Sequence, residues 1–266
     1  MKLFYRSIGT GEPIVILHGL YGSSDNWLTV GKAIALKNRI ILLDQRNHGQ
    51  SPHTASHNYA LMSDDLDEFM KSENIQNPII IGHSMGGKVA MRYCLEHPDK
   101  VKGLVVVDIS PEEYTERKQS ATSHLEEHRK IVNALLAMPL DSLESRNDAD
   151  TNLNLSIPQT RIRQFLLKNL KRNKDGAFYW ALNLDAIQQN LFALMEGINS
   201  KGYTYNGPTL FIKGSESDYI TEESRNKIQN IFPNAQLRTI QDAGHWVHAE
   251  QTSKFVELVQ NFLATV

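Results

Sequence analysis

A serine flanked by glycines stands where a short apolar run passes into a helical pattern. Three isoleucines precede the pentapeptide Gly82-His83-Ser84-Met85-Gly86. A sharp strand-to-helix turn strains the backbone at its serine, so the residues two before and two after it must be small. The first helical turn also offers unpaired N–H groups and a positive dipole end to an oxygen that gains negative charge. The pattern predicts that Ser84 is a nucleophile.

A serine hydroxyl needs a base that takes its proton and a third group that orients this base. Of the ten histidines, His245 is the best candidate, because it lies between the predicted last strand and the final helix. His248 is a weaker one. Asp108 closes one apolar run and Asp218 follows the next. Both fall at the predicted carboxyl edge of a sheet, so these residues alone leave Asp108 and Asp218 open as the acid.

Acyl transfer also needs two N–H donors for the oxygen that becomes negative, each typically worth ~10²–10³ in rate. We expect one from Met85, the residue after the nucleophile. The loop His18-Gly19-Leu20-Tyr21-Gly22 follows another apolar run, and we choose the N–H of Leu20 as the second donor. His18 is expected to brace this loop. The expected chemistry needs no metal and no organic cofactor.

Short apolar runs alternate with helix-length segments and predict the scaffold. The runs lie at 14–17, 40–43, 79–81, 104–107, 209–212 and 236–240. Runs of this kind are typical of strands buried on both faces of a mostly parallel sheet, with helices on either side. Helical patterns at about 222–231 and at the end of the chain complete this α/β arrangement.

The stretch 110–205 breaks this rhythm and reads as helices and loops only. The segments spaced for amphipathic helices are 135–140, 165–170 and 186–195. Between them, 147–156 is polar and loop-like. We therefore expect a helical cap at 110–205, inserted into a core domain made of 1–109 and 206–266. Such a cap would cover the carboxyl edge of the sheet, where open α/β sheets bind ligands.

The composition is that of an ordinary soluble protein. The hydrophobic share of the 266 residues is 41%, the charged share is 22% and the formal net charge is −2, which gives no sign of a nucleic-acid partner. Cys94 is the single cysteine and cannot form an internal disulfide. Without a signal-peptide pattern or an apolar run of ~20 residues, we expect a cytoplasmic protein with no membrane partner. It would act on a small molecule, as a monomer or a homodimer.

Several motifs together resemble the α/β-hydrolase family over nearly the whole chain. They are His18-Gly19, the segment 44–51, the segment 82–88 and Gly244-His245-Trp246, in the family's order and spacing. Within the family the chain looks most like the YbfF-type bacterial esterases and their mitochondrial relatives. The residues that carry this likeness are Asn47, Lys88, 183–186 and 245–250.

The resemblance implies a mostly parallel, doubly wound sheet with a helical cap inserted after the sixth strand. It also implies a serine carboxylesterase that hydrolyses short-chain carboxylic esters through an acyl-enzyme. Most family members carry the acid where this chain has Ser217, one residue before Asp218, whereas Asp108 matches the acid of the YbfF-like subgroup. We therefore favour Asp108 and keep Asp218 as the alternative.

Other functions remain open on the same residues. An acyl-CoA thioesterase or a carbon–carbon bond hydrolase would use the same serine, base and acid. A non-catalytic small-molecule receptor would have the same fold without the activity. The segment His124-Leu125-Glu126-Glu127-His128 fits a zinc pattern, which we interpret as a solvated helix face. A basic group in the cap would attract an anionic substrate or simply be solvated, and we favour solvation. It comprises Arg161, Arg163, Lys168, Lys171, Arg172 and Lys174.

Overall fold

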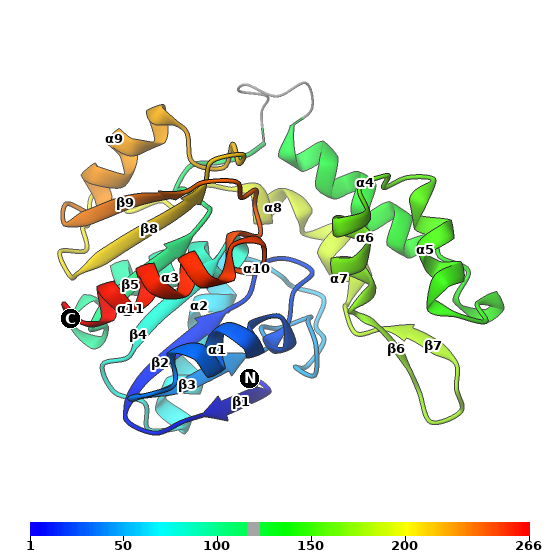
Figure 1. Cartoon of the computed structure of the whole chain (residues 1–266), viewed down its shortest axis with the longest axis horizontal. Helices are drawn as coiled ribbons and strands as arrows, with labels where there is room; N and C mark the ends of the chain where they lie inside the picture. The colour runs from blue at the N-terminus through cyan, green and yellow to red at the C-terminus, as the bar shows by residue number, and fades with distance from the viewer. Residues whose placement is uncertain (116–122) are drawn as a thin grey trace.

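A seven-stranded sheet forms the centre of the computed structural model, which describes residues 1–115 and 123–266 (Figure 1). The strand order is β1-β3-β2-β4-β5-β8-β9. All neighbours are parallel except β1, which pairs with β3 in the antiparallel sense. The strands are β1 (Tyr5–Ile8), β2 (Glu12–Leu17), β3 (Asn38–Leu43), β4 (Ile79–His83), β5 (Gly103–Val107), β8 (Thr209–Gly214) and β9 (Ala235–Ile240).

The apolar runs of the sequence form the middle of this sheet. In β4 and β5 every residue is buried, because helices cover both faces and leave no side for polar residues. The six predicted strands are present, most of them one or two residues longer than the runs. The edge strand β1 was not predicted. Its sequence Tyr-Arg-Ser-Ile is half-buried and carries no continuous apolar signal.

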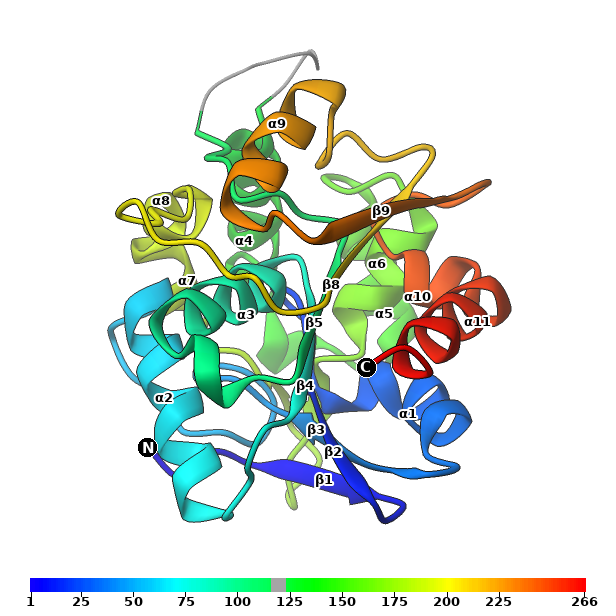
Figure 2. The ribbon, with the colours of Figure 1, turned by 90° about the vertical axis from the view of Figure 1, so that its left-hand side faces the viewer.

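Helices cover the two faces of the sheet (Figure 2). The helices α2, α3 and α9 lie on one face, and α1 and α11 lie on the other. Alternate residues of one strand serve the two cores: Val106 belongs to the core on the α3 side of the sheet, whereas Val105 belongs to the core on the α11 side. The bounds are α1 (Leu28–Ile34), α2 (Tyr59–Ser72), α3 (Met85–Glu96), α9 (Glu222–Ile231), α10 (Val247–Glu250) and α11 (Thr252–Leu263), with short 3₁₀ turns at Ser24–Trp27, Pro98–Lys100 and Leu140–Ser142.

The chain between β5 and β8 forms a separate layer of helices, seen on the right in Figure 1, so the insertion follows the fifth strand along this chain and not the sixth. We call its described residues, 110–115 and 123–205, the cap segment; part of the predicted cap, 116–122, lies outside the described residues. Its elements are α4 (His124–Leu136), α5 (Arg146–Asn154), α6 (Thr160–Leu167), β6 (Leu170–Arg172), β7 (Phe178–Trp180), α7 (Leu184–Gln189) and α8 (Leu191–Met195).

The sequence predicted a cap of helices and loops only, but the cap segment also contains a short β-hairpin. Strands β6 and β7 pair in an antiparallel hairpin, with Leu170 opposite Trp180. The aromatic residues of β7 favour an extended backbone, and the side chain of Asn173 accepts hydrogen bonds from two N–H groups in the turn. The apolar spacing around Leu170 therefore indicated a helix wrongly, because two short strands follow α6 there.

The polar stretch 147–156 was predicted as a loop and forms most of helix α5 instead. Ser145 and Asp148 make a capping box: the N–H of Asp148 donates to the Ser145 hydroxyl, and the N–H of Ser145 donates to the Asp148 carboxylate. Ala149 and Leu153, one helical turn apart, are the buried pair that anchors it. Across residues 1–115 and 123–266, no helix is both long and apolar enough to cross a bilayer.

Candidate active site

Ser84 occupies the turn from β4 into α3 in a strained backbone conformation, with φ 51° and ψ −118°. Its N–H donates to the carbonyl of Val107 in the neighbouring strand at 3.0 Å. A Cβ on Gly82 would lie 2.3 Å from the carbonyl oxygen of Gly86, and one on Gly86 would lie 2.4 Å from that of Leu17. Side chains at either position would clash with backbone, so the glycines allow the turn that presents Ser84.

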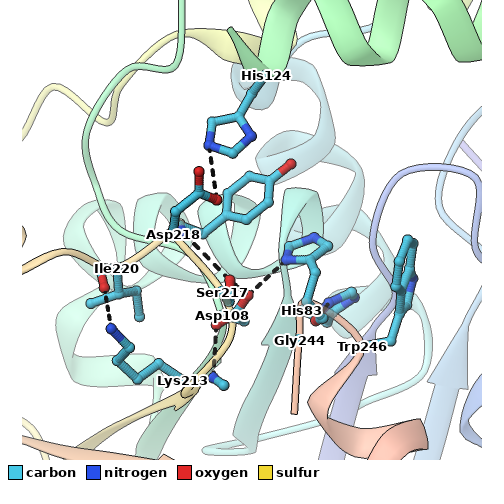
Figure 3. Close-up of polar contacts among 12 residues, drawn as sticks. His83, Asp108, His124, Lys213, Ser217, Asp218, Ile220, Gly244 and Trp246 are labelled. Carbon is cyan, nitrogen blue, oxygen red and sulfur yellow. Dashed lines mark hydrogen bonds and ion pairs between the residues drawn. The ribbon is translucent and has the colours of Figure 1, made fainter. Parts of the chain in front are cut away.

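Asp108 follows β5 directly and also has a positive φ, 49°. Its N–H donates to the carbonyl of Ile212 at 2.8 Å, so the strand β8 fixes its backbone. The buried carboxylate accepts hydrogen bonds from the N–H of Gly214 at 3.0 Å and from the hydroxyl of Ser217 (Figure 3). Burial raises the pKa of Asp108, and these two donors oppose the rise. The carboxylate is thus fixed in both position and direction.

His245 lies after β9 with its Nδ1 atom 2.8 Å from the Oδ2 atom of Asp108. A proton on Nδ1 that points to the carboxylate leaves Nε2 with a lone pair. Burial lowers the pKa of His245, so the imidazole is neutral at pH 7 and able to accept a proton. His245 and Ser84 line the same cavity. The structure therefore brings together nucleophile, base and one of the two candidate acids.

Asp218, the alternative acid, points in another direction. Its Oδ1 atom lies 3.5 Å from Nε2 of His124 at the start of α4, and 48% of its side chain is exposed (Figure 3). The carboxylate that contacts His245 comes from Asp108 instead. Asp218 thus joins the loop after β8 to the cap segment.

The two predicted oxyanion donors lie on either side of Ser84. Met85 begins α3, and Leu20 belongs to the loop after β2 and lines the same cavity as Ser84. Among the described residues, no protein group accepts a hydrogen bond from either N–H. A Cβ on Gly19 would lie 2.7 Å from the ring of His83, so the glycine lets this loop approach the nucleophile turn.

Two buried histidines hold the Leu20 loop. Nε2 of His48 accepts a hydrogen bond from the N–H of Tyr21 at 3.2 Å. Nε2 of His18 accepts one from the N–H of Gln45 at 3.0 Å, while its Nδ1 contacts the carbonyl of Gly19 at 2.8 Å. Burial lowers the pKa of both imidazoles, which keeps them neutral acceptors. His18 therefore braces the loop, as expected.

The cavity above Ser84 has a volume of about 220 Å³ and takes its roof from the cap segment. The core contributes Leu20, Tyr21, His83, Ser84, Glu216, Ser217, Asp218, Tyr219, His245 and Trp246, and the cap segment contributes His124, Glu127, His128, Ile131, Ile162, Phe165 and Leu166. Eight of these seventeen side chains are apolar or aromatic, and the other nine are polar, four of them histidines. Such a mixed lining suits a small substrate with an apolar part and a polar reacting group.

Sequence reasoning missed two residues of this site. Ser217 donates to the carboxylate of Asp108, which gives a function to the serine found where most relatives carry the acid. The ring of Tyr219 lies between two histidines, with centroids 4.0 Å from His245 and 4.1 Å from His124. Both residues follow β8 in the loop that carries Asp218, but nothing in a single sequence says which side chain of a loop turns inward.

The zinc-like motif and the basic group of the cap segment have other partners. The two histidines of the motif do not lie on a solvated helix face, as was expected: both line the cavity, His124 faces Asp218 and Tyr219, and Nε2 of His128 lies 3.3 Å from the hydroxyl of Tyr219. In the described part of the chain, no three His, Cys, Asp or Glu residues are arranged to hold a metal ion. Of the basic residues, Arg163 is buried and pairs with Asp150 at 2.9 Å, which makes it part of the packing of α5 and α6.

Comparisons with known proteins agree with this geometry. The alpha/beta hydrolase fold family matches residues 12–252. The chain is 39% identical to the mouse sn-1-specific diacylglycerol lipase ABHD11, over 94% of this chain and 80% of the lipase, and 32% identical to the Escherichia coli esterase YbfF, over 95% and 93%. The solved structure of a marine microorganism esterase superimposes with a TM-score of 0.93 at 44% identity, over 98% of this chain and 99% of that one.

Proposed function

Because this chain belongs to the α/β-hydrolase family and is a carboxylic ester hydrolase, we propose that it cleaves short-chain carboxylic esters through an acyl-enzyme on Ser84. The fold predicted from the sequence is confirmed, with a mostly parallel sheet of seven strands between helices. Within it we propose a core of 1–109 and 206–266 and a cap of 110–205 as the two working parts. One observation carries the mechanism: a neutral His245, held by Asp108, shares a cavity with Ser84.

In the proposed first step, the hydroxyl of Ser84 attacks the ester carbonyl while Nε2 of His245 takes its proton. The tetrahedral oxygen becomes negative and receives hydrogen bonds from the N–H groups of Leu20 and Met85. Asp108 stabilises the imidazolium that forms. His245 then returns the proton to the leaving alcohol, and the carbonyl re-forms as an ester of Ser84.

A water molecule completes the cycle by the same route. His245 takes one proton from the water, the resulting hydroxide adds to the acyl carbonyl, and Ser84 leaves with the proton from His245. The products are a carboxylic acid and the free serine. The same two oxyanion donors serve both tetrahedral species, since each places its charge on the former carbonyl oxygen.

The size of the cavity supports short acyl groups. Its volume of about 220 Å³ lies below the ~300–1,000 Å³ of pockets that enclose drug-sized ligands. A long acyl chain would need the roof residues Ile131, Ile162 and Phe165 to move. We expect kcat/KM for p-nitrophenyl esters to be highest between acetate and butyrate and to fall at octanoate. A steady rise up to octanoate would contradict this assignment.

We also propose a subgroup of the family for this chain. We place the chain with the YbfF-type esterases and their relatives, supported by 32% identity to YbfF and 39% identity to the mouse lipase ABHD11. Diacylglycerol, the substrate in that lipase's name, is a useful substrate for comparison. A higher kcat/KM for diacylglycerol than for p-nitrophenyl butyrate would identify the protein as a lipase. A higher kcat/KM for the thioester with the same acyl group would identify it as a thioesterase.

Replacement of the nucleophile tests the mechanism directly. Ser84→Ala should lower kcat for p-nitrophenyl acetate by at least about 10⁴-fold and abolish labelling by a fluorophosphonate. Ser72→Ala is the matched control, since this serine lies at the end of α2 and donates only to the carbonyl of Phe69. Turnover that survives Ser84→Ala would reject the acyl-enzyme.

A further inference from the structure

Lys88 is a fully buried lysine in the first turns of α3, four residues after Ser84. Lysine is almost never fully buried unless its ammonium group has partners. Here the Nζ atom donates to the carbonyl oxygen of Glu112 at 2.8 Å and to that of Glu196. A buried donor group that binds two main-chain carbonyls fixes the backbone on which those carbonyls lie.

The two carbonyls belong to the two places where the chain passes between core and cap. Glu112 lies just after β5, where the chain leaves the sheet, and Glu196 follows α8, where it begins to return. We call residues 110–114 and 195–198 the stalks. They pair with each other: the N–H of Tyr114 donates to the carbonyl of Met195, and that of Ile198 to the carbonyl of Pro111, both at 2.8 Å. One side chain of the nucleophile helix therefore joins both stalks.

The same lysine lies against a tyrosine that leads to the base. Its Nζ is 4.7 Å from the ring centroid of Tyr114. The hydroxyl of Tyr114 donates to the carbonyl of Tyr219 at 2.6 Å, and the ring of Tyr219 stacks on His245. A continuous set of contacts thus runs from Lys88 through two tyrosines to the imidazole.

A second tyrosine holds the end of α8, directly before the stalk at 195–198. The ring of Tyr59 lies 5.4 Å from Nζ of Lys88, and its hydroxyl donates to the carbonyl of Leu194 at 2.5 Å. Lys88 therefore lies at the point where helices α2 and α3 meet both stalks. Burial lowers the pKa of Lys88 to about 7, but the two carbonyls need only two N–H donors, which the neutral amine also supplies.

We propose that Lys88 is a positioning residue that fixes both stalks on the nucleophile helix, sets the height of the cap over Ser84 and keeps Tyr219 against His245. The roles of Ser84 and His245 rest on the proposed function. The attachment of the cap does not. Without the Nζ group, the carbonyls of Glu112 and Glu196 lose the donor that ties them to α3, so we expect the stalks to separate from α3 and the roof of the cavity to rise.

The test is Lys88→Met, which keeps an unbranched four-atom side chain and removes the Nζ donors. We expect the amides of Tyr114 and Ile198 to exchange hydrogen at least tenfold faster, with the amides of β4 and β5 unchanged. We expect KM for p-nitrophenyl butyrate to rise at least fivefold, with a smaller change in kcat. Lys102→Met is the matched control, since Lys102 is on the surface and pairs with Glu12.

A folded Lys88→Met protein whose stalk exchange and KM stay within twofold of the wild type would overturn the proposal. Should this variant not fold, Tyr114→Phe decides. It keeps the ring beside Lys88 and removes the hydroxyl that holds Tyr219 and that also accepts from the N–H of Ser110 at 2.9 Å, so kcat should fall about tenfold while the amides of residues 114 and 198 exchange as in the wild type. An unchanged kcat would overturn the proposal. Hydrogen exchange of the stalk amides is measured without substrate. It therefore tests the attachment of the cap even if Ser84 is not the nucleophile.

Discussion

The floor and the roof of the catalytic cavity are held in different ways. On the floor, Ser84 and Asp108 have positive φ angles, and backbone hydrogen bonds to Val107 and Ile212 in the neighbouring strands fix both. The roof depends on side-chain contacts between the cap segment and core loops, such as Phe165 against Trp246 at 5.2 Å. Strained backbone within a sheet cannot shift easily, whereas rings in contact can repack. We infer that the floor sets the reaction and the roof selects the substrate.

Asparagine at each candidate acid gives the sharpest contrast between floor and roof. Asp108→Asn should lower kcat by about 10⁴-fold, because an amide neither holds the reactive tautomer of His245 nor stabilises its protonated form. Asp218→Asn removes only the contact with His124 on the roof and should change kcat by less than about threefold. Steady-state kinetics on p-nitrophenyl acetate measure both. The opposite ranking would make Asp218 the acid.

Acid should destabilise the fold through three buried imidazoles: His57, just before α2, His128 on the roof and His245 after β9. Burial lowers the pKa of His57 and of His128 to about 3 and also lowers that of His245. Unfolded histidine binds a proton near pH 6.5, so between about pH 6.5 and 3 the unfolded state holds more protons. The free energy of unfolding should therefore fall with falling pH, by about 1.4 kcal/mol per pH unit for each such histidine.

Urea unfolding at pH 7, 6 and 5 measures this slope. His128→Gln removes one histidine of the roof. It should reduce the dependence of the free energy of unfolding on pH by about 1.4 kcal/mol per pH unit, the contribution of one histidine. The acid limb of kcat/KM should also lie below pH 6.5, because His245 must be neutral to act as the base. If His128→Gln left the slope unchanged, the imidazole of His128 would not be buried as described.

The floor was predictable from the sequence and most of the roof was not. Ser84 and His245, which line one cavity, could be picked out as candidates because a strained turn demands glycines and a chain order follows from the fold. The strands around them were found because burial on both faces gives continuous apolar runs. The glycines of the turn and the apolar runs of the strands are local features of the chain, so a single sequence is enough to recognise them.

The errors have a physical cause as well. Helix α5 was missed because its polar residues hid a capping box and one buried pair, Ala149 and Leu153. Ser217 and Tyr219 were missed because loop side chains owe their direction to tertiary contacts, here with Asp108 and His245. The choice between Asp108 and Asp218 could not be made from residue spacing for the same reason. The family resemblance favoured Asp108, the acid whose carboxylate contacts His245.

A change on the roof should alter selection more than rate. Phe165→Ala removes a ring that lines the cavity and contacts Trp246, which lengthens the space above Ser84. The ratio of kcat/KM for p-nitrophenyl octanoate over acetate should rise by about 10- to 100-fold, the range of a few methylene contacts. Phe192→Ala is the control, since 62% of that side chain is exposed. If the ratio did not change, Phe165 on α6 would not help to select the acyl chain length.

The smallest expected effect lies on the floor, at Ser217. Its hydroxyl donates to the same carboxylate oxygen of Asp108 that faces His245, and a hydrogen bond to a charged group contributes about 1.5–3 kcal/mol. Ser217→Ala removes one of the donors that oppose the burial-driven rise in the pKa of Asp108, so the acid limb of kcat should move to higher pH. At pH 7 we expect kcat to fall about tenfold with KM nearly constant.

Ser215→Ala is the matched control two residues away, since its hydroxyl accepts only from the N–H of Asp242, outside the cavity. Ser217→Asp adds a second carboxylate beside Asp108, and like charges raise the pKa of at least one of them, so its acid limb should move further than that of Ser217→Ala. If KM changed and the pH profile did not, Ser217 would act on the substrate rather than on Asp108, and the floor would share in selection.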